Sequence, residues 1–477
     1  MSYKLSAGEK EKFESMVTSA MADMHIPGMS IALVEDSEIL YARGFGARNL
    51  EENLPATTET LYGIGSCTKS FTATAIMQLM EDDKLLIADP ITKYLPVRWN
   101  DDDDPITIHH LLSMSSGMPN LGVASILIGR LTGQDTEKTF PMSSFDDLLV
   151  HLNGAKDELA TDPGKRCFYF NSGYTLLGEI VARVTKLPYA RYIREKILDP
   201  LGMKRSTFLQ EQLEQETDRM TPYVTQQKDG EVKLTPTNHP FNKLIFAPGG
   251  LLSSVTELSN YLSTQIGGGV FEEEKLLDAS LMNEMHKIQF ETEFFRHYIG
   301  DYGKMGYGYG WMVASDFHGH KLVMHGGSTG VSSAQLMFLP ELKIGLAATA
   351  NVGQVPIPVL QAALVMLLGK DPEREIPDFT IQKKMDLLTG EYAIYKGIVT
   401  VSVVQKGAML YLEGKLGGQK MSVPLIPEGD LLDDLKFYII QEPGKKLPIE
   451  FDVADEGKID LYVERNRFHK IKGKIPD

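Results

Sequence analysis

Cysteine is scarce in this chain: Cys67 and Cys167 are the only two among 477 residues. Two cysteines cannot form a disulfide framework, and their separation does not match the spaced pairs of a zinc site. We interpret each as a buried small hydrophobic side chain and expect a cytoplasmic, reducing location. The N-terminal residues show no apolar segment typical of a secretory signal, which favours the same location.

Long apolar runs and excess positive charge are also missing. No stretch of about 18 apolar residues occurs, so no membrane-spanning helix is predicted. The formal net charge of −16 disfavours nucleic acid or an anionic membrane as a partner. The acidic run 101–104 and the pair His109-His110 lack further ligands, and no glycine-rich phosphate loop follows a predicted strand. We therefore expect neither a metal nor a cofactor.

Strand-like segments lie at both ends of the first 350 residues, with helical stretches between them. An N-terminal hairpin is predicted at residues 29–34 and 39–42. The other predicted strands are short apolar runs at 311–313, 321–324, 334–338 and 344–349. Helical stretches are predicted at 7–24, 66–83, 107–112, 171–198 and 256–265. This order predicts an α/β (α+β) sandwich whose sheet is assembled from both ends, with a helical subdomain inserted at roughly residues 80–260.

The pattern changes after residue 370. The segment 371–380 contains two prolines and is predicted to be a linker between residues 1–370 and residues 381–477. The last segment holds about eight short apolar runs, spaced by about 8–12 residues and separated by turn signals such as Lys406-Gly407 and Gly417-Gly418. This spacing predicts a small antiparallel β-barrel or sandwich.

The first candidate for chemistry is Ser66-Cys67-Thr68-Lys69, at the start of a predicted helix. Residues three apart lie on one side of a helix, so the Lys69 amine can reach the Ser66 hydroxyl. A serine hydroxyl needs an adjacent base to act as a nucleophile, and a neutral lysine can be that base. Helix entry at Ser66 also directs backbone N–H groups toward developing negative charge. Alone the motif is weak, because such a spacing arises by chance.

Two further motifs follow along the chain. In Tyr169-Phe170-Asn171, the tyrosine offers a phenolic donor and acceptor, and the asparagine an amide that orients its neighbours. In His325-Gly326-Gly327, the glycines let a substrate backbone approach a strand closely, and the histidine can relay a proton or donate a hydrogen bond. Taken alone, each motif is more typical of an ordinary core or turn.

In this order, the three motifs resemble those of the serine β-lactamase and penicillin-binding-protein superfamily, in its class C-like branch (the peptidase S12 type). That family has Ser-x-x-Lys, then Tyr-x-Asn, then Lys/His-x-Gly. The resemblance covers about residues 15–365 and includes supporting segments such as Pro248-Gly249-Gly250. It implies a β-lactamase/transpeptidase-like fold. The C-terminal segment resembles the lipocalin-like barrel of archaeal self-compartmentalising serine proteases that prefer D-amino acids.

The resemblance also implies roles for the motif residues. Ser66 would be acylated, and Lys69 and Tyr169 would share general base and acid duty, with His325 as a further catalytic group. Asn171 would hold Lys69 or the substrate amide. Gly326 and Gly327 would flank the substrate. The backbone N–H groups of Ser66 and Ser328 would form the oxyanion hole.

The implied function is a serine hydrolase that acts on a small peptide, amide or ester through an acyl-enzyme. We expect a peptidase or amidase for short peptides, D-configured ones included. A carboxylesterase of the same mechanism is the alternative, and a weak β-lactamase or non-catalytic penicillin-recognising protein is another. His325 stands where classical β-lactamases carry a lysine, which disfavours efficient β-lactamase action. The barrel would bind a small ligand, cover the active site or form a homo-oligomer.

Overall fold

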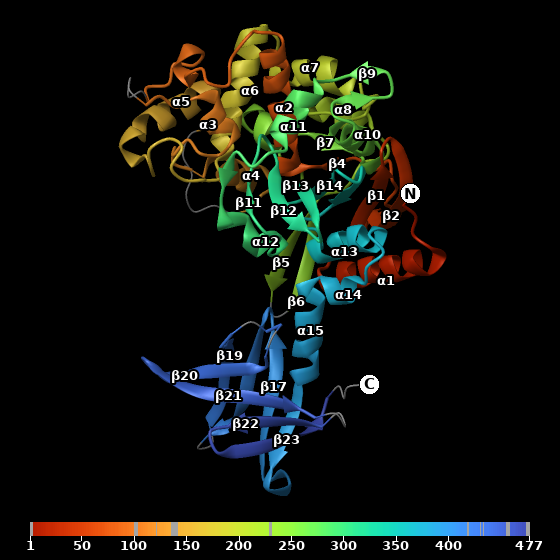
Figure 1. Ribbon diagram of the computed structural model, residues 1–477, viewed down its shortest axis with the longest axis vertical. Helices are drawn as coiled ribbons and strands as arrows, with labels where there is room; N and C mark the ends of the chain where they lie inside the picture. The colour runs from red at the N-terminus through yellow and green to blue at the C-terminus, as the bar shows by residue number, and fades with distance from the viewer. Residues whose placement is uncertain are drawn as a thin grey trace. The chain divides into compact units, whose positions relative to one another are not determined.

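The computed structural model describes residues 3–99, 104–120, 122–134, 142–228, 231–416, 419–429, 431–432, 434–454 and 458–473. It divides the chain into two compact units, Met1–Leu368 and Gly369–Asp477 (Figure 1). Of the predicted acidic loop, residues 101–103 lie outside the described ranges, as does the turn signal Gly417-Gly418.

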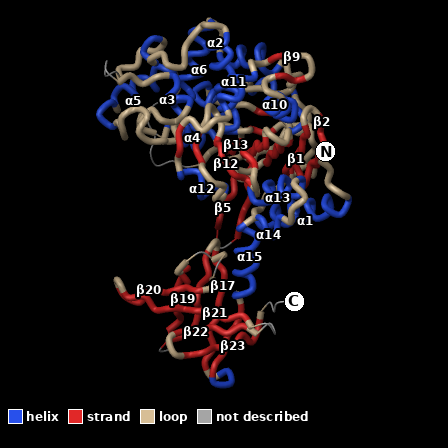
Figure 2. Tube along the Cα trace, in the orientation of Figure 1, coloured by secondary structure: helices blue, strands red, loops and turns tan. Residues whose placement is uncertain are grey.

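The first unit is built on a sheet whose central strands come from opposite ends of the sequence. Within the described residues it has nine strands, in the order β10-β11-β12-β13-β14-β15-β1-β2-β3. Strand β1 pairs antiparallel with β15, so that Met29 lies opposite Ala350. This pairing confirms the predicted sandwich with a sheet assembled from both ends. Figure 2 shows strands of this unit, among them β1, β2, β12 and β13, together with its helices. The strands are β1 (Gly28–Glu35), β2 (Glu38–Asn49), β3 (Leu54–Pro55), β10 (Phe290–Glu291), β11 (Met305–Tyr307), β12 (Met312–Phe317), β13 (His320–Ser328), β14 (Ser333–Leu339) and β15 (Ile344–Ala350).

Helices cover this sheet. Helix α10 (Val255–Ile266) packs on β1 and β15, and α13 (Ile357–Leu367) packs on β15 and on α1 (Ala7–Asp23). Every residue of β14 and β15 is buried. Strands covered on both faces read as continuous apolar runs rather than as an alternation, which is why these two were visible in the sequence.

In the sequence, the predicted helical subdomain lies between the strands that form the two halves of the sheet. Helix α2 (Thr68–Glu81) follows the short helix η1 (Gly65–Cys67), and its residues from Thr68 to Met77 are all buried. The predicted stretch 171–198 forms α6 (Asn171–Thr185), α7 (Tyr189–Ile193) and η4 (Arg194–Leu198), with the break at Pro188. The other helices are α3 (Ile108–Leu112), α4 (Val123–Leu131), α5 (Phe145–Gly154), α8 (Gln210–Gln215), α9 (Phe246–Gly249), α11 (Ala279–Met285), α12 (Arg296–Ile299), η2 (Ile91–Lys93), η3 (Lys156–Glu158), η5 (Lys243–Ile245) and η6 (Glu293–Phe295). Short strand pairs are β4 (Tyr62–Gly63) with β7 (Leu252–Ser253), β5 (Tyr223–Lys228) with β6 (Glu231–Pro236), and β8 (Val270–Phe271) with β9 (Glu274–Lys275).

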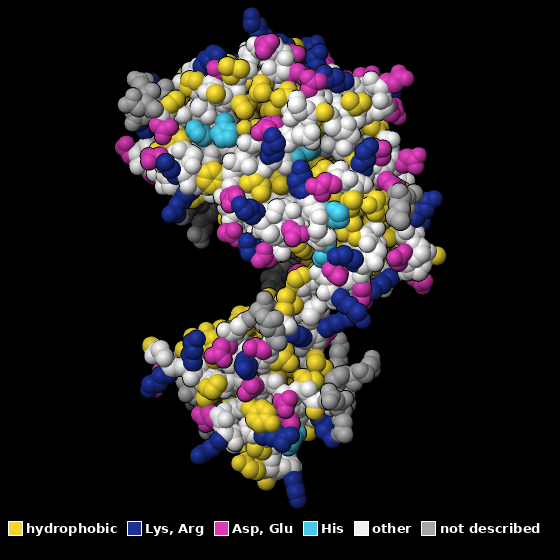
Figure 3. Space-filling model, in the orientation of Figure 1, with side chains coloured by type: hydrophobic (Ala, Val, Ile, Leu, Met, Phe, Trp, Pro, Cys, Tyr) yellow, Lys and Arg dark blue, Asp and Glu magenta, His cyan; other side chains and the backbone are white. Residues whose placement is uncertain are grey.

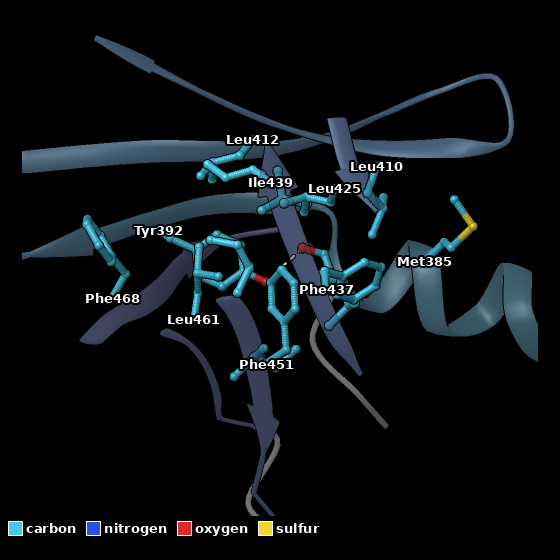
Figure 4. Close-up of a cluster of buried hydrophobic side chains, with 14 residues drawn as sticks. Met385, Tyr392, Leu410, Leu412, Leu425, Phe437, Ile439, Phe451, Leu461 and Phe468 are labelled. Atoms are coloured by element: carbon cyan, nitrogen blue, oxygen red, sulfur yellow. Dashed lines mark hydrogen bonds between the residues drawn. The ribbon is translucent and has the colours of Figure 1, made fainter. Parts of the chain in front are cut away.

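The second unit contains a closed antiparallel barrel, which confirms the predicted β-barrel. Its eight strands within the described part of the chain are β16 (Gly390–Ile394), β17 (Val399–Lys406), β18 (Met409–Leu416), β19 (Gln419–Pro427), β20 (Lys436–Glu442), β21 (Lys445–Val453), β22 (Ile459–Val463) and β23 (Asn466–Lys472). Its interior is filled by side chains such as Tyr392, Leu461 and Phe451 (Figure 4). The Tyr392 hydroxyl donates to the Leu388 carbonyl oxygen at 2.7 Å, so this buried polar group is satisfied.

The segment predicted as a linker lies at the start of the second unit and contains helices. Helices α14 (Pro372–Glu375) and α15 (Pro377–Leu388) each begin with a proline. Proline is tolerated in the first turn because its missing N–H would have no partner within the helix there. The prolines that suggested a linker therefore start two helices, while the 3₁₀ helix η7 (Tyr395–Gly397) follows β16 in the barrel.

On the face shown in Figure 3, acidic and basic side chains are interspersed rather than gathered by sign. Within the described ranges, no helix has both the length and the apolar character needed to cross a membrane.

Three buried histidines make the first unit sensitive to acid. Burial lowers the pKa of His239, His286 and His325 from 6.5 to about 3. Below pH 6.5 the unfolded chain therefore binds protons that the folded chain does not, and stability falls as pH falls. Each histidine contributes up to about 1.4 kcal/mol per pH unit to this fall in stability.

We expect the urea concentration at the midpoint of unfolding to drop between pH 7 and pH 5. A His286→Gln variant should show a shallower drop, since glutamine can keep the hydrogen bond to Gln265 (2.8 Å) without titrating. An equal drop in the urea midpoint for the variant and the wild type would contradict this role of His286.

Candidate active site

Ser66 is held at the start of the buried central helix. It lies in η1, directly before α2, and is partly exposed while Gly65 and Cys67 on either side are buried. Gly65 has a φ of +52°, a conformation that favours glycine. The turn thus presents the Ser66 hydroxyl to solvent at the N-terminal end of a helical segment, where backbone N–H groups favour negative charge.

The Lys69 amine lies against Ser66, as the spacing predicted. Its Nζ is 2.9 Å from Ser66 Oγ, 2.7 Å from Asn171 Oδ1 and 2.8 Å from the Pro248 carbonyl oxygen. The Lys69 side chain is fully buried, and this burial holds its pKa well below the usual value of 10.5. A neutral amine is therefore favoured, because burial disfavours the charged form.

The hydrogen-bond partners of Lys69 define the direction of its lone pair. The Asn171 and Pro248 oxygens can only accept hydrogen bonds. A neutral amine has two hydrogens and one lone pair, so these two oxygens take both hydrogens. The lone pair is left for the third partner, the Ser66 hydroxyl. This is the arrangement that a general base requires.

Tyr169 and Asn171 reach the same place from the start of α6. Asn171 is the first residue of that helix. The Tyr169 ring centroid lies 4.7 Å from Lys69 Nζ, and its hydroxyl is hydrogen-bonded with Ser66. Burial raises the Tyr169 pKa well above its usual value of 10. The phenol therefore keeps its proton near neutral pH and can donate it.

The backbone of strand β13 packs closely against the turn that carries Ser66. A Cβ added to Gly65 would lie 2.3 Å from the Ser328 nitrogen, and one added to Gly327 would lie 2.7 Å from the Ser66 nitrogen. Such close approach requires glycine on both sides. The two glycines thus bring the backbone nitrogens of Ser66 and Ser328 to the same edge of the site.

A Gly65→Ala variant should lose most of its activity. The new Cβ would collide with the Ser328 nitrogen, and alanine is also strained at a φ of +52°. The Ser328 N–H is the expected oxyanion donor, and displacing one such donor costs about 10²–10³-fold in kcat. Gly407→Ala is the matched control: it has a similar φ of +60° but nothing within 4 Å of the added Cβ. If both variants lost the same activity, close packing at Gly65 would not matter.

His325 lies behind the site rather than in it. Its side chain is fully buried. Nδ1 is 2.6 Å from the Gly326 carbonyl oxygen, which can only accept, so Nδ1 carries the proton. Nε2, 2.9 Å from the Tyr307 hydroxyl, then accepts. Burial, with Lys69 adding to it, lowers the His325 pKa to about 3, so the ring is neutral. The structure places it beside the Tyr169 ring, with a centroid separation of 6.3 Å.

A cavity of about 600 Å³ opens beside Ser66. The predicted site residues that line it are Ser66, Tyr169, Gly326, Gly327 and Ser328. The remainder of the lining is largely apolar and aromatic: Phe294, Phe295, Tyr298, Ile299, Met312, Met324, Ser333, Ala334, Gln335, Gly353, Gln354, Val355 and Ile357. This volume is typical of a small-molecule site.

Sequence reasoning missed several parts of this site. Pro248 was recognised only as part of a supporting segment of the resemblance, yet its carbonyl oxygen binds Lys69. Tyr307, which binds His325, and the aromatic residues after Glu293 carry no motif. A backbone carbonyl has no sequence signature of its own, so only the tertiary fold reveals its role.

The cysteines do not take part. Cys67 is buried and donates its thiol to the His325 carbonyl oxygen at 3.1 Å, as expected for a packed side chain. Cys167 is only partly buried. Burial raises the pKa of both thiols to about 12. In the part of the chain that the structure describes, no group of three His, Cys, Asp or Glu residues is placed to hold a metal ion.

Fold and site together define a serine enzyme of the β-lactamase and penicillin-binding-protein type, and the chain belongs to the β-lactamase family. Residues 13–368 match the β-lactamase family model, and residues 372–469 match the Pab87 octamerisation domain. The chain is similar to the octameric penicillin-binding protein homologue from Pyrococcus abyssi. That structure is 36% identical with a TM-score of 0.86, over 96% of this chain and 99% of the other.

Two further similarities are more distant. A class C β-lactamase structure has a TM-score of 0.59 at 19% identity, over 76% of this chain and 95% of that one, which shows a shared fold. Protein flp of Staphylococcus aureus (strain MW2) is 27% identical over 367 residues, which are 75% of this chain. The aligned region spans 66% of the length of that protein.

Proposed function

We propose that this protein is a serine hydrolase that works through an acyl-enzyme on Ser66, and that it acts on short peptides or amides. The observation that carries the proposal is the set of contacts around Lys69. Its two hydrogens are taken by acceptor oxygens, and its lone pair is directed at the Ser66 hydroxyl. A serine with a positioned neutral amine is an activated nucleophile.

The proposed reaction has two stages. Lys69 takes the Ser66 proton as Oγ attacks the substrate carbonyl carbon, and the backbone N–H groups of Ser66 and Ser328 stabilise the oxyanion. Tyr169, protonated near neutral pH, then gives its proton to the leaving amine or alcohol, and Lys69 returns a proton to the tyrosine. Water next attacks the acyl-enzyme and restores the Ser66 hydroxyl, with the same groups in reversed roles.

The test compares matched D- and L-aminoacyl peptides with the full-length protein, using Ser66→Ala as control. Turnover that depends on Ser66 would support the peptidase proposal, and preference for the D-form would support the likeness to proteases that accept D-residues. Absence of peptide cleavage would overturn the peptidase proposal.

A carboxylesterase of the same mechanism is the second candidate, because the cavity beside Ser66 is largely apolar. Aryl esters would then be the substrates to try.

The barrel is proposed to form a homo-oligomer. The match to an octamerisation domain and the octameric homologue support this. The barrel interior is filled by side chains, which disfavours a ligand inside it. Its surface exposes Tyr395 (63%) and Ile398 (83%), large apolar side chains of a kind that partner chains cover.

Sedimentation of the intact chain should show an oligomer, and Ile398→Asp should weaken that oligomer. A monomeric wild-type protein would overturn this proposal.

A further inference from the structure

The cavity beside Ser66 lacks charge. Among the described residues, none of those that line it has a formally charged side chain at neutral pH. Its apolar wall comes from three parts of the first unit: η6 with α12, strands β12 and β13, and the segment after β15. The wall consists of Phe294, Phe295, Tyr298, Ile299, Met312, Met324, Val355 and Ile357. A carboxylate moved from water into such surroundings would be strongly disfavoured unless it were paired.

The two basic side chains around Ser66 are already engaged. Lys69 is buried and contacts Ser66, Asn171 and Pro248. His325 uses both ring nitrogens and is neutral. These contacts leave neither side chain free to pair with a substrate carboxylate.

Arg296 is held in the same way. It lies in α12, beside the aromatic wall, and forms ion pairs with Glu293 and Asp301. Its charge is therefore balanced by two carboxylates of its own segment. An anionic substrate group would have to compete with both of them.

An anionic substrate would also impair the base. A negative charge within about 4–6 Å favours the protonated form of an amine. A carboxylate bound beside Ser66 would therefore raise the pKa of Lys69. The lone pair that faces the serine would then bind a proton and could no longer act as a base. A neutral substrate leaves that lone pair free.

Two exposed aromatic side chains line part of the cavity. Phe294 and Tyr298 are 45% and 56% exposed, although both are large and apolar. Their rings are in edge contact, with centroids 6.1 Å apart. Aromatic groups prefer to pack on such faces and edges. The cavity volume of about 600 Å³ has room for a ring with a short chain.

We propose that the substrate group in this cavity is uncharged and apolar, of the size of an aryl or branched alkyl group, and that substrates with a carboxylate in this position are rejected. This specificity rests on the proposed function and names the substrate class of the same site. It covers amides and esters alike, because it concerns the group beside the reacting carbonyl and not the bond that is cleaved.

The kinetic test uses three 4-nitrophenyl esters with the full-length protein: the acetate, the 4-phenylbutyrate, and the 4-(4-carboxyphenyl)butyrate. The last two differ only by a carboxylate. We expect kcat/KM for the phenyl ester to exceed that for the carboxylated ester by about 10-fold or more. Equal values, or preference for the anion, with turnover that still depends on Ser66, would overturn the inference and leave the hydrolase proposal standing.

Binding provides a test that needs no turnover. Calorimetry on Ser66→Ala would compare the neutral 4-phenylbutyramide (the amide) with 4-(4-carboxyphenyl)butyramide (the carboxylate), which differ only by the carboxylate on the ring. Tighter binding of the amide, by about 10-fold, supports the inference. Equal or tighter binding of the carboxylate overturns it. If no ester or peptide is hydrolysed in a Ser66-dependent way while the amide binds more tightly, the proposed hydrolase function fails and the neutral binding site stands.

Variants locate the effect. Met312→Lys, at a partly exposed position in the cavity wall, should raise the carboxylated-to-phenyl ratio of kcat/KM by about 10-fold, because it supplies the missing cation. Val150→Lys adds the same charge at a position that is 71% exposed and outside the cavity lining, and should leave the ratio unchanged. Tyr298→Ala should lower the phenyl-to-acetate ratio by about fivefold. If neither cavity variant moved its ratio, the substrate group would lie elsewhere.

Discussion

Replacing Ser66 with alanine is expected to reduce turnover by about 10⁴-fold or more while the fold is kept. The hydroxyl is the atom that would form the acyl bond, and nothing else at the site can replace it. Ser66 is partly exposed and makes only one of the three Lys69 contacts, so little packing is lost. The measurement is kcat/KM on a cleaved peptide or ester, beside a thermal unfolding curve.

Ser70→Ala is the matched control for this variant. Ser70 lies four residues further along, in α2, is buried, and donates to the Cys67 carbonyl oxygen at 2.8 Å. Its loss should lower the free energy of unfolding by about 1 kcal/mol but leave turnover close to wild type. If Ser66→Ala kept wild-type rates, another residue would have to be the nucleophile.

The second large effect is expected at Lys69. Lys69→Met keeps the length of the side chain but removes the base, and kcat/KM should fall by about 10²–10⁴-fold. The Asn171 and Pro248 oxygens would lose their donor, so the free energy of unfolding should fall by about 1–3 kcal/mol.

The pH profile gives an independent sign of the same role. In the wild type, burial holds the Lys69 pKa well below 10.5, and activity should fall as pH drops through this lowered pKa because the base becomes protonated. The residual activity of Lys69→Met should lack that acid limb. A variant with the wild-type pH profile would show that the limb belongs to another group.

The sequence predicted the chain topology of this protein well because its signals are local. Strands β14 and β15 are buried along their whole length and therefore appear as apolar runs. Pro188 interrupts a long helical pattern where the structure also breaks. At residues 371–380 the two prolines did not reveal the helices that they begin, because proline both breaks a helix interior and starts a helix.

The site was predictable only in part, for a physical reason. Ser66 and Lys69 are related by helix geometry, so their contact follows from spacing. His325 depends instead on which side of β13 it occupies and on the Tyr307 hydroxyl that meets it there. The Pro248 carbonyl depends on how α9 packs on α2. Such contacts are set by tertiary packing, which no spacing along the chain encodes.

The pairing of β1 with β15 has a consequence for how the chain folds. Gly28 to Glu35 leave the ribosome early, but their hydrogen-bonding partners at Ile344 to Ala350 are made only after more than 300 further residues. The edges of β1 must stay unpaired or be occupied only by β2 during that interval, which exposes a buried-type strand to aggregation. Strands of the barrel pair mainly with their immediate successors. In refolding, the barrel should therefore form ahead of the long-range sheet, because loop closure delays distant contacts more than neighbouring ones.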